Sequence, residues 1–328
     1  MSFPYHSAVV VAGGGGFIGG HLVGALLAQG HRVRAVDRKP TRDWYQVHAD
    51  AENVVADLTR IEACMTACQG MQACYQLAAD MGGMGFIENN KALCMLSVLV
   101  STHMLVAARE QGLDSIFYAS SACVYNAGKQ SSEDAAPLKE ADAYPAMPED
   151  GYGWEKLFSE RMHRHFREDF GLRTRVARYH NVYGPHGTWR GGREKAPAAI
   201  CRKVIQAKRS GATTIEIWGD GRQTRSFMYI DDCVKGTLDI MHCDVVEPIN
   251  LGSDELITIN GLVDLVEEIA GVRLRREYRL DAPKGVNGRN SDNRMILAEL
   301  GWKPSIRLCD GMERTYRWIH DEYARTYS

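Results

Sequence analysis

The sequence has no long apolar run, almost no net charge and no regular cysteine spacing, and each absence excludes a class of protein. No apolar stretch approaches the roughly 18 residues that a membrane-spanning helix needs, so we expect no membrane anchor. A net charge of -2 gives no general attraction to nucleic acid or anionic lipid, so an anionic ligand has to be held by local basic residues. Residues 1–6 run directly into a strand-like segment, and we expect no signal peptide.

The nine cysteines are an odd number without the spacing of a disulfide framework, which favours a reducing compartment. Cys64, Cys68 and Cys74 match no familiar zinc pattern, and we interpret them as small packing residues rather than metal ligands. We therefore expect a cytoplasmic protein without a metal site. A chain of 328 residues, of which 45% are hydrophobic and 24% charged, can form one large or two interlocked domains.

The first half of the chain alternates strand-like and helix-like segments. Strands are expected at residues 8–12, 32–36, 53–56, 73–77, 115–119 and 173–178. Helices are expected between most of them, including 19–29, 89–111 and 152–170. Strands that alternate with helices imply right-handed crossovers, so we predict an α/β fold with a Rossmann-type, doubly wound parallel sheet.

After Tyr183 the pattern changes to a glycine-rich loop, residues 184–192, and then to a helix that opens at Pro197, a residue favoured in first turns. We therefore expect a smaller lobe, interleaved with the first domain and covering the carboxyl edge of its sheet. The predicted division assigns residues 1–182 and about 226–248 to the larger domain, and residues 183–225 and 249–328 to the smaller lobe.

Three glycines follow the first expected strand with the spacing of a dinucleotide-binding fingerprint. Gly13 allows a tight turn, Gly16 lets the backbone approach a pyrophosphate, and Gly19 lets the helix pack on the strand. A generic glycine-rich turn is the alternative, but Asp37 at the end of the second strand argues against it. Asp37 can bind both ribose hydroxyls and would repel a 2′-phosphate, so NAD is favoured over NADP, although the basic Arg38 weakens that preference. The predicted cofactor residues are Gly13, Gly16, Phe17, Ile18, Gly19, Asp37, Arg38, Asp57, Leu58, Leu77, Ala78, Ala79, Tyr152 and Lys156.

Tyr152 and Lys156 lie one helical turn apart on the same face of an expected helix. A lysine ammonium in that position should lower the pKa of the tyrosine and hold the nicotinamide ribose. Ser121, at the end of an expected strand, should orient the reacting hydroxyl while Tyr152 takes its proton as hydride leaves the carbon. A Tyr-x-x-x-Lys pair is common by chance, but its place after the fingerprint and after Ser121 favours a catalytic role.

Cys123 follows Ser121 by two residues and adds an acid or base that redox chemistry alone does not need. A small buried packing residue is the alternative interpretation. Lys195 lies just before an expected helix, where Arg193 and the positive end of the helix dipole should lower its pKa; a solvated surface lysine is the alternative. The two groups together suggest an enzyme that oxidises a carbon temporarily in order to move protons on its neighbours.

Basic residues of the smaller lobe form a second group of candidates. Arg225 and Arg289 lie on polar loops, and two arginines on such loops suit bidentate clamping of a nucleotide diphosphate. Lys203, on the helix after Lys195, could add a third cation. Surface salt bridges are an equally weighted alternative for each residue taken singly.

With these residues on the page, the chain resembles the extended short-chain dehydrogenase/reductases, in particular the nucleotide-sugar epimerases and dehydratases. Longer segments narrow the resemblance to the GDP-mannose 3,5-epimerase family. They are residues 77–87, 118–123, 187–199, 218–227 and 288–293. The resemblance covers nearly the whole chain, and the loops of the smaller lobe are more specific than the shared dinucleotide motifs.

This resemblance implies an NAD-dependent isomerase in which Tyr152 assists oxidation at C4 of GDP-D-mannose. Cys123 and Lys195 would then epimerise C3 and C5 from opposite faces, and re-reduction would give GDP-L-galactose, with GDP-L-gulose as a side product. It also implies a homodimer formed through helices 89–111 and 152–170. The implied substrate contacts are Gly82, Gly83, Ser121, Ala122, Cys123, Tyr152, Asn181, Glu194, Lys195, Ala196, Lys203, Gln223, Arg225 and Arg289.

Other functions remain open on the same scaffold. A 4,6-dehydratase is expected to carry Asp-Glu in place of Ala122-Cys123, and a 4-epimerase usually has threonine in place of Cys123. A non-catalytic dinucleotide sensor would typically lose the pair formed by Tyr152 and Lys156. These comparisons favour epimerisation of ring carbons, whereas the preference for guanine rests on the resemblance alone.

Overall fold

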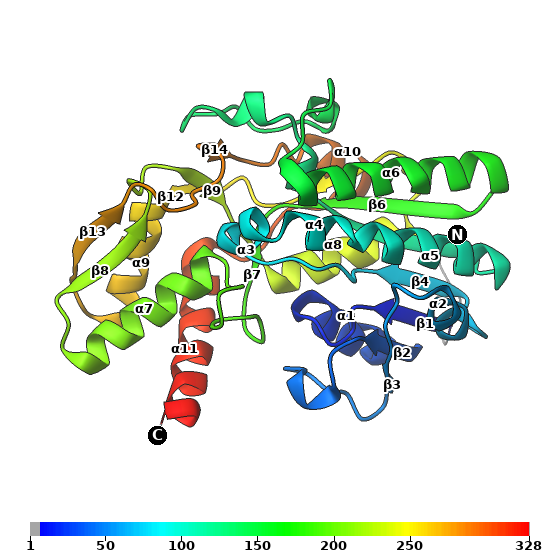
Figure 1. The fold of residues 1–328 in the computed structure, drawn as a ribbon, viewed down its shortest axis with the longest axis horizontal. Helices are drawn as coiled ribbons and strands as arrows, with labels where there is room; N and C mark the ends of the chain where they lie inside the picture. The colour runs from blue at the N-terminus through cyan, green and yellow to red at the C-terminus, as the bar shows by residue number, and fades with distance from the viewer. Residues whose placement is uncertain (1–6, 328) are drawn as a thin grey trace.

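The computed structural model describes residues 7–327, which form a large sheet-based domain joined to a smaller lobe (Figure 1). Within that range, seven parallel strands form the main sheet in the order β11-β6-β5-β4-β1-β2-β3. Their bounds are β1 Ala8–Ala12, β2 Arg32–Asp37, β3 Glu52–Val55, β4 Ala73–Gln76, β5 Ser115–Ser121, β6 Arg173–Tyr179 and β11 Ile249–Leu251. The predicted Rossmann-type, doubly wound parallel sheet is confirmed.

Helices cover both faces of this sheet (Figure 1). One face carries α1 (Phe17–Ala28) and α8 (Ile230–His242), and the other carries α2 (Ile61–Cys68), α5 (Ser97–Glu110) and α6 (Asp150–Phe170). Successive side chains of β1 therefore enter different apolar clusters, Val9 and Val11 on one side and Val10 on the other. Burial on both sides explains why β1 is a continuous apolar run rather than an alternating one.

The order of the strands creates a switch point between β1 and β4. The chain passes from β1 outward to β2 and β3, then returns so that β4 pairs with the other side of β1. At such a point the crossovers diverge, and ligands bind outside the carboxyl ends of the strands. The segments after β1, β4 and β5 are therefore the ones that form the site.

The smaller lobe is built from α7 (Ala196–Ser210), α9 (Ile259–Ala270), α11 (Leu308–Tyr327) and short strands (Figure 1). β8 (Thr214–Trp218) pairs with β13 (Arg275–Arg279), and β9 (Thr224–Ser226) lies between β12 (Leu256–Thr258) and β14 (Gly288–Arg289). One apolar cluster runs from the sheet into this lobe, so the two parts share a core. The remaining elements are α3 Met84–Asn89, α4 Lys91–Met95, β7 Val182–Tyr183, β10 Met228–Tyr229, α10 Arg294–Leu300 and four 3-10 turns, η1 Thr41–Asp43, η2 Ala122–Val124, η3 Ala127–Gln130 and η4 Glu140–Ala143.

One predicted boundary is wrong. We placed residues 249–328 in the smaller lobe, but β11 is the edge strand of the main sheet and pairs with β6. The reason is the apolar α8, which returns the chain across the sheet and leaves the buried segment Ile249–Leu251 beside β6. The rest of the predicted division stays a prediction.

The helix expected at 89–111 is two helices, α4 and α5, joined at Leu96. By length and composition alone, Lys91–Glu110 is the one helical stretch in residues 7–327 that could cross a membrane. In this fold, 44% of its most apolar window is buried, and α5 packs between α2 and α6. Several large apolar side chains of α4, α5 and α6 are nevertheless exposed.

Candidate active site

The turn between β1 and α1 is built from glycine backbone. Gly13 has a φ of +85°, and its N–H donates to the carbonyl of Val36 at 2.7 Å. A Cβ on Gly19 would lie 2.0 Å from the carbonyl oxygen of Gly13, so glycine alone lets α1 start this close to the strand. Gly16 precedes α1, and no side chain in the described part of the chain caps that helix. Its first N–H groups are open to an anionic ligand, which fits the pyrophosphate of NAD.

The carboxyl ends of β2 and β3 carry the predicted adenosine contacts. Asp37 ends β2, and its Oδ1 accepts a hydrogen bond from the N–H of Lys39 at 3.0 Å. Asp57 follows β3, and hydrogen bonds from the N–H and hydroxyl of Thr59 lower the pKa of its carboxyl. Leu58 beside it is buried. Asp37 and Asp57 therefore both offer acceptor oxygens at the sheet edge, where ribose hydroxyls and adenine amines would need them.

The other predicted cofactor residues lie around the glycine turn. Phe17 and Ile18 open α1 and pack against the main apolar cluster. A Cβ on Gly13 would lie 2.9 Å from the backbone nitrogen of Ala78, so the segment 77–79 after β4 lies directly against the turn. The fold thus brings these predicted cofactor residues together at one edge of the sheet, an arrangement that fits a dinucleotide.

Tyr152 and Lys156 lie in the first two turns of α6 and are both buried. The Nζ of Lys156 donates to the carbonyl of Ala119 at 3.0 Å and lies 5.6 Å from the ring centre of Tyr152. It also lies 4.7 Å from the ring centre of Tyr118 and 3.7 Å from the carboxylate of Glu155. The end of β5 therefore fixes the lysine beside the tyrosine, as the predicted roles require.

The ionisation of Tyr152 differs from our expectation. Burial raises the pKa of Tyr152 well above its usual range, whereas a hydrogen bond with Ser121 acts in the opposite direction. We expected Lys156 to lower that pKa, but burial outweighs any such effect in this structure. The reason is that surroundings of low polarity penalise a phenolate more than the neighbouring groups favour it. Tyr152 is a neutral phenol in this structure.

Cys123 lies in η2, directly after β5, and is buried against Tyr152. Its N–H donates to the Oγ of Ser121 at 3.2 Å, and its carbonyl accepts from the N–H of Glu149 at 2.9 Å. A Cβ on Gly153 would lie 2.4 Å from the same carbonyl. The start of α6 is thus pressed against η2, which brings the thiol and the phenol into one cluster.

Arg289, on β14 of the smaller lobe, reaches this cluster. Its guanidinium donates to the Sγ of Cys123 at 3.6 Å, to the Oε1 of Gln130 at 2.6 Å and to the carboxylate of Glu149. Burial and Glu149 raise the pKa of the Cys123 thiol, while Arg289 acts to lower it. The sulfur is therefore a thiol at neutral pH, with a guanidinium against it.

Lys195 is the N-cap of α7, as predicted, and is half-buried. Its pKa is lowered, also as predicted, but for a different reason. Burial is the main cause, and Cys123 and Cys233 oppose it. Arg193, which we expected to be responsible, instead pairs with Asp80 at 2.6 Å. An amine with a lowered pKa and a thiol with a raised one thus share the same neighbourhood.

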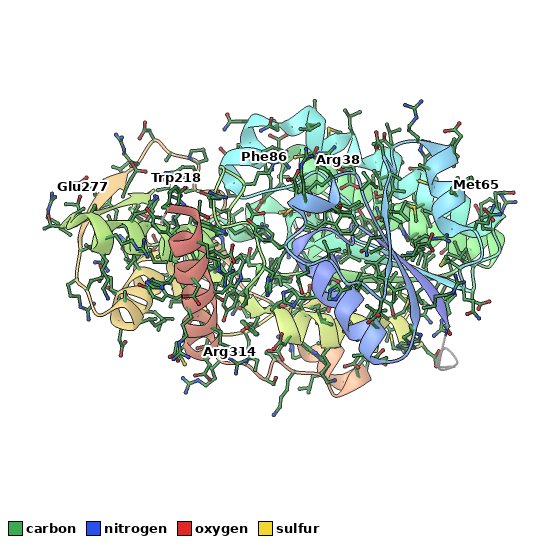
Figure 2. All side chains as sticks on the ribbon, turned by 90° about the horizontal axis from the view of Figure 1, so that it is seen from below. Arg38, Met65, Phe86, Trp218, Glu277 and Arg314 are labelled. Carbon is green, nitrogen blue, oxygen red and sulfur yellow. The ribbon has the colours of Figure 1, made fainter. Side chains whose placement is uncertain are left out.

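Asp80 connects the cofactor edge to the loop that carries Lys195. One of its carboxylate oxygens binds Arg38 at 2.7 Å and the other binds Arg193 at 2.6 Å. The guanidinium of Arg193 also lies 3.7 Å from the ring centre of Phe86. In Figure 2, Arg38 and Phe86 lie near each other on one side of the molecule. The buried carboxylate of Asp80 therefore holds both Arg38, which follows Asp37, and Arg193, which lies two residues before Lys195.

The predicted contacts at Gly82, Gly83, Glu194 and Ala196 lie at this junction. The N–H of Gly83 donates to the carbonyl of Arg193 at 3.0 Å, and a Cβ on Gly83 would lie 2.5 Å from the carbonyl of Glu194. Ala196 is the first residue of α7. The loop after β4 and the loop before α7 are thus in direct contact.

Lys203 and Gln223 lie in the smaller lobe near Trp218. The Nζ of Lys203 donates to the carbonyl of Glu216 at 2.9 Å, and burial lowers the pKa of that amine. The amide nitrogen of Gln223 donates to the carbonyl of Trp218 at 2.9 Å, whereas its Oε1 is buried without a partner among residues 7–327. Trp218 lies beyond Phe86 along the molecule in Figure 2. This arrangement leaves an acceptor for a donor on a bound ligand.

Arg225 and Asn181 bind mostly backbone. Arg225 donates to the carbonyls of Thr224, Lys284 and Val286, and burial lowers its pKa to about 10. Asn181 has a φ of +37° and donates to the carbonyl of Ser226 at 3.0 Å. Because Arg225 and Arg289 both have protein partners here, their predicted binding to a diphosphate stays a prediction.

Sequence reasoning missed three residues of the cluster: Asp80, Gln130 and Glu149. Glu149 had a weak signal, because it lies three residues before Tyr152 at the start of the expected helix. An acidic residue there is typical of ordinary helix starts, so nothing local pointed to Arg289. Asp80 and Gln130 had no signal, because their partners are distant in sequence.

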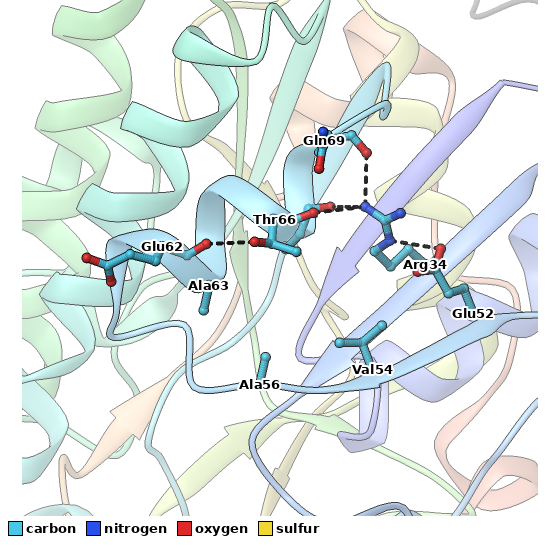
Figure 3. Close-up of a pocket in the computed structure, with 9 residues that line it drawn as sticks. Arg34, Glu52, Val54, Ala56, Glu62, Ala63, Thr66 and Gln69 are labelled. Atoms are coloured by element: carbon cyan, nitrogen blue, oxygen red, sulfur yellow. Dashed lines mark hydrogen bonds and ion pairs between the residues drawn. The ribbon is translucent and has the colours of Figure 1, made fainter.

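A surface pocket of about 410 Å³ between β3 and α2 shares no residue with any predicted site (Figure 3). Arg34 lines it and donates to the carbonyls of Thr66, Ala67 and Gln69 at the end of α2, and to the carboxylate of Glu52. The last carbonyls of a helix lack partners within it, so Arg34 caps α2. We interpret the pocket as structural. In the described part of the chain, no group of histidine, cysteine and acidic residues could hold a metal ion.

Comparisons with known proteins agree with this geometry. The model of the NAD dependent epimerase/dehydratase family matches residues 9–252. A GDP-mannose 3,5-epimerase of Arabidopsis thaliana is 44% identical over 315 residues, which cover 96% of this chain and 82% of that protein. GDP-mannose 3,5-epimerase 1 of Oryza sativa subsp. japonica shows the same identity and coverage. Among solved structures, UDP-glucose 4-epimerase of Thermotoga maritima aligns with a TM-score of 0.87 at 24% identity, covering 96% of this chain and 99% of that one, which shows the shared fold.

Proposed function

Because this chain belongs to the NAD dependent epimerase/dehydratase family, and within it to the GDP-mannose 3,5-epimerases, we propose that it epimerises GDP-D-mannose at C3 and C5 to GDP-L-galactose. Family membership makes the protein an isomerase that uses NAD and acts on a nucleotide sugar, so these broader predictions are confirmed. The substrate, the products and the role of each residue belong to the proposal, and so does a cytoplasmic location.

One observation carries the proposal. The end of β5 brings Cys123 against Tyr152, while Lys195 reaches the same neighbourhood from the start of α7. Oxidation of an alcohol needs only Ser121, Tyr152 and Lys156. Two further proton carriers of opposite type, a thiol and an amine, suit a reaction that inverts carbons next to the oxidised one.

The steps follow from the acidity of the sugar. Bound NAD supplies a reversible two-electron oxidation of the C4 alcohol. Tyr152 first loses its own proton to solvent and becomes a phenolate. Ser121 then hydrogen-bonds the C4 hydroxyl, and the phenolate accepts the proton of that hydroxyl. The C4 ketone acidifies the hydrogens on C3 and C5, since each carbanion is delocalised as an enolate. Cys123 and Lys195 then remove and return protons from opposite faces, and Tyr152 finally gives a proton back to the C4 oxygen.

NMR of GDP-mannose incubated with the protein in deuterated water tests this proposal. We expect deuterium at C3 and C5 of the sugar, galacto-configured product and a smaller amount of GDP-L-gulose. Conversion of a different nucleotide sugar, with no exchange into GDP-mannose, would overturn the substrate while leaving the family unchanged. Deuterium at neither carbon with any substrate would overturn the roles of Cys123 and Lys195.

We also propose that two copies form a dimer through α4, α5 and α6. These helices pack together, and several of their large apolar side chains remain exposed to solvent. They are Leu93, Met95, Leu96, Leu99, Trp154 and Phe158. A second copy of the same face would bury them in a symmetric contact between the helices of the two copies. Light scattering at micromolar concentration should give twice the chain mass, and Phe158→Glu should shift it toward a monomer; a monomeric parent chain would contradict the dimer.

A further inference from the structure

Cys123 is surrounded by polar and titratable groups from several elements, and only some of them were expected near it. α6 contributes Tyr152 and, at its N-cap, Glu149; Ser121 comes from β5 and Lys195 from the start of α7. The smaller lobe adds Arg225 and Arg289, and α4 adds Cys94. Of these side chains, Arg289 contacts the sulfur itself, at 3.6 Å.

Glu149 is the nearest counter-charge to that guanidinium. Its carboxylate accepts from Arg289; the Arg289 side chain is buried, with 6% of its surface exposed, and that of Glu149 is mostly buried, with 12% exposed. The second oxygen of Glu149 has no hydrogen-bond partner among the described residues. Its negative charge is therefore directed at Arg289 rather than shared with other donors.

The geometry of this contact is fixed at both ends. The N–H of Glu149 donates to the carbonyl of Cys123 at 2.9 Å, which ties the start of α6 to η2. The Nε of Arg289 donates to Gln130 at 2.6 Å, and Gln130 is fully buried. Carboxylate, guanidinium and thiol are thus held in successive contact by backbone and by a neutral amide.

The balance of charge around Cys123 determines whether its sulfur keeps its proton. A lone guanidinium beside a buried thiol favours the thiolate, because opposite charges attract strongly where water is excluded. A guanidinium already paired with a carboxylate is close to neutral overall, and burial then keeps the proton on sulfur. The carboxylate therefore acts on Cys123 through Arg289, without touching the sugar.

We propose that Glu149 is a positioning residue that, through Arg289, holds Cys123 in its protonated form in the resting enzyme. The catalytic importance of this inference rests on the proposed function, because the proton on Cys123 is the one exchanged with the sugar. Its test is independent of that function, because the ionisation of Cys123 can be measured without substrate.

The test is a titration of thiolate absorbance near 240 nm in the full chain with its NAD. Each protein is compared with the same chain carrying Cys123→Ser, so that the other eight cysteines and the tyrosines cancel. Glu149→Gln keeps the shape and the acceptor oxygen but removes the charge, and we expect the Cys123 midpoint to fall by about one pH unit or more. Glu149→Asp keeps the charge and should stay close to the parent. Arg289→Gln should raise the midpoint.

Glu133→Gln is the matched control. Glu133 pairs with Arg222 of the smaller lobe at 3.1 Å, but that pair is at the surface and away from Cys123. Its loss should leave the midpoint unchanged. In active protein, the limb of the pH profile for hydrogen exchange that reports Cys123 should move with the absorbance midpoint in Glu149→Gln.

A folded Glu149→Gln protein with the parental midpoint would overturn the proposal, since a merely structural role for Glu149 predicts that result. If Glu149→Gln does not fold, Arg289→Gln decides, and a midpoint that fails to rise overturns the proposal. If the midpoint shifts as expected but the parent protein converts no GDP-mannose, this inference stands and the proposed function is overturned instead.

Discussion

The predicted dinucleotide end and the predicted sugar end of the site are built in different ways. The first is backbone: Gly13, Gly16 and Gly19 shape a turn whose N–H groups would face the pyrophosphate of NAD, and the space around these glycines is what matters there. The second is a set of buried or half-buried ionisable side chains, in which Cys123, Glu149, Tyr152, Lys195 and Arg289 come from four segments of the chain. Added atoms should therefore disrupt NAD binding at the first end. Moved protons or charges should disrupt epimerisation at the second.

The largest effect should follow from Cys123→Ser, which removes a proton carrier but adds no bulk. We expect epimerisation to fall by about 10²- to 10⁴-fold, the usual contribution of a general acid or base, while NAD stays bound. Deuterium exchange at C3 and C5 and the absorbance of released cofactor measure the two effects. Cys309→Ser, on α11 and partly exposed, is the control and should behave like the parent. Near-normal exchange of sugar hydrogens in Cys123→Ser would refute the assignment.

Gly19→Ala should break the other end by adding one methyl group. Since that carbon would lie 2.0 Å from the carbonyl of Gly13, α1 has to move, at a cost of about 3 kcal/mol in unfolding free energy and most of the bound NAD. Urea unfolding and NAD content check this prediction. In the control, Gly171→Ala, the new carbon meets no neighbour and only the φ of +71° is strained, so we expect a loss of about 1 kcal/mol with NAD retained. Equal NAD loss in both variants would contradict the argument.

Acid should weaken the side of the sheet next to the sugar end. Burial lowers the pKa of His163, which stacks on Tyr118, to about 4. The unfolded chain binds this proton below its ordinary pKa of 6.5, whereas the folded chain does not, so the stability is complete above 6.5 and is lost as pH falls toward 4. At about pH 5 the loss from this residue is about 2 kcal/mol. Urea unfolding at about pH 7.5 and about pH 5 should show that much less pH dependence in His163→Phe. An unchanged pH dependence would show that the histidine is not responsible.

The smallest effect should come from a site outside both ends. Arg34→Met removes the guanidinium that caps α2, and we expect about 1–2 kcal/mol of lost stability from its hydrogen bonds to three carbonyls. NAD content and sugar exchange should stay at parental values. A change in either one would mean that the pocket beside α2 belongs to the functional site after all.

The same contrast explains which features could be predicted from the sequence. The glycine turn, Asp37 and the helical pair Tyr152 and Lys156 are local patterns, because each is fixed by spacing along one strand or helix. Strand ends were correct to within two residues for β1 to β6 for the same reason, since burial on both faces leaves an apolar run that can be counted.

The charge network could not be predicted, because it depends on contacts between distant segments. Arg289 meets Glu149 across 140 positions, and Asp80 meets Arg193 across 113. No local pattern marks such a partner, and each residue alone is typical of a surface salt bridge. Our wrong explanation for the lowered pKa of Lys195 has the same origin, because Arg193 is only two residues away in sequence but is held by Asp80.

The place of β11 has a consequence for the way this chain is made. The main sheet gains its last strand only when residues 249–251 arrive, after more than 60 intervening residues that begin the smaller lobe. While the ribosome is still adding that stretch, β6 presents an unpaired edge, the kind of surface on which growing chains stick to one another. The nascent larger domain therefore needs the second half of the polypeptide before it is protected, and truncation before Ile249 should favour aggregation over a smaller folded product.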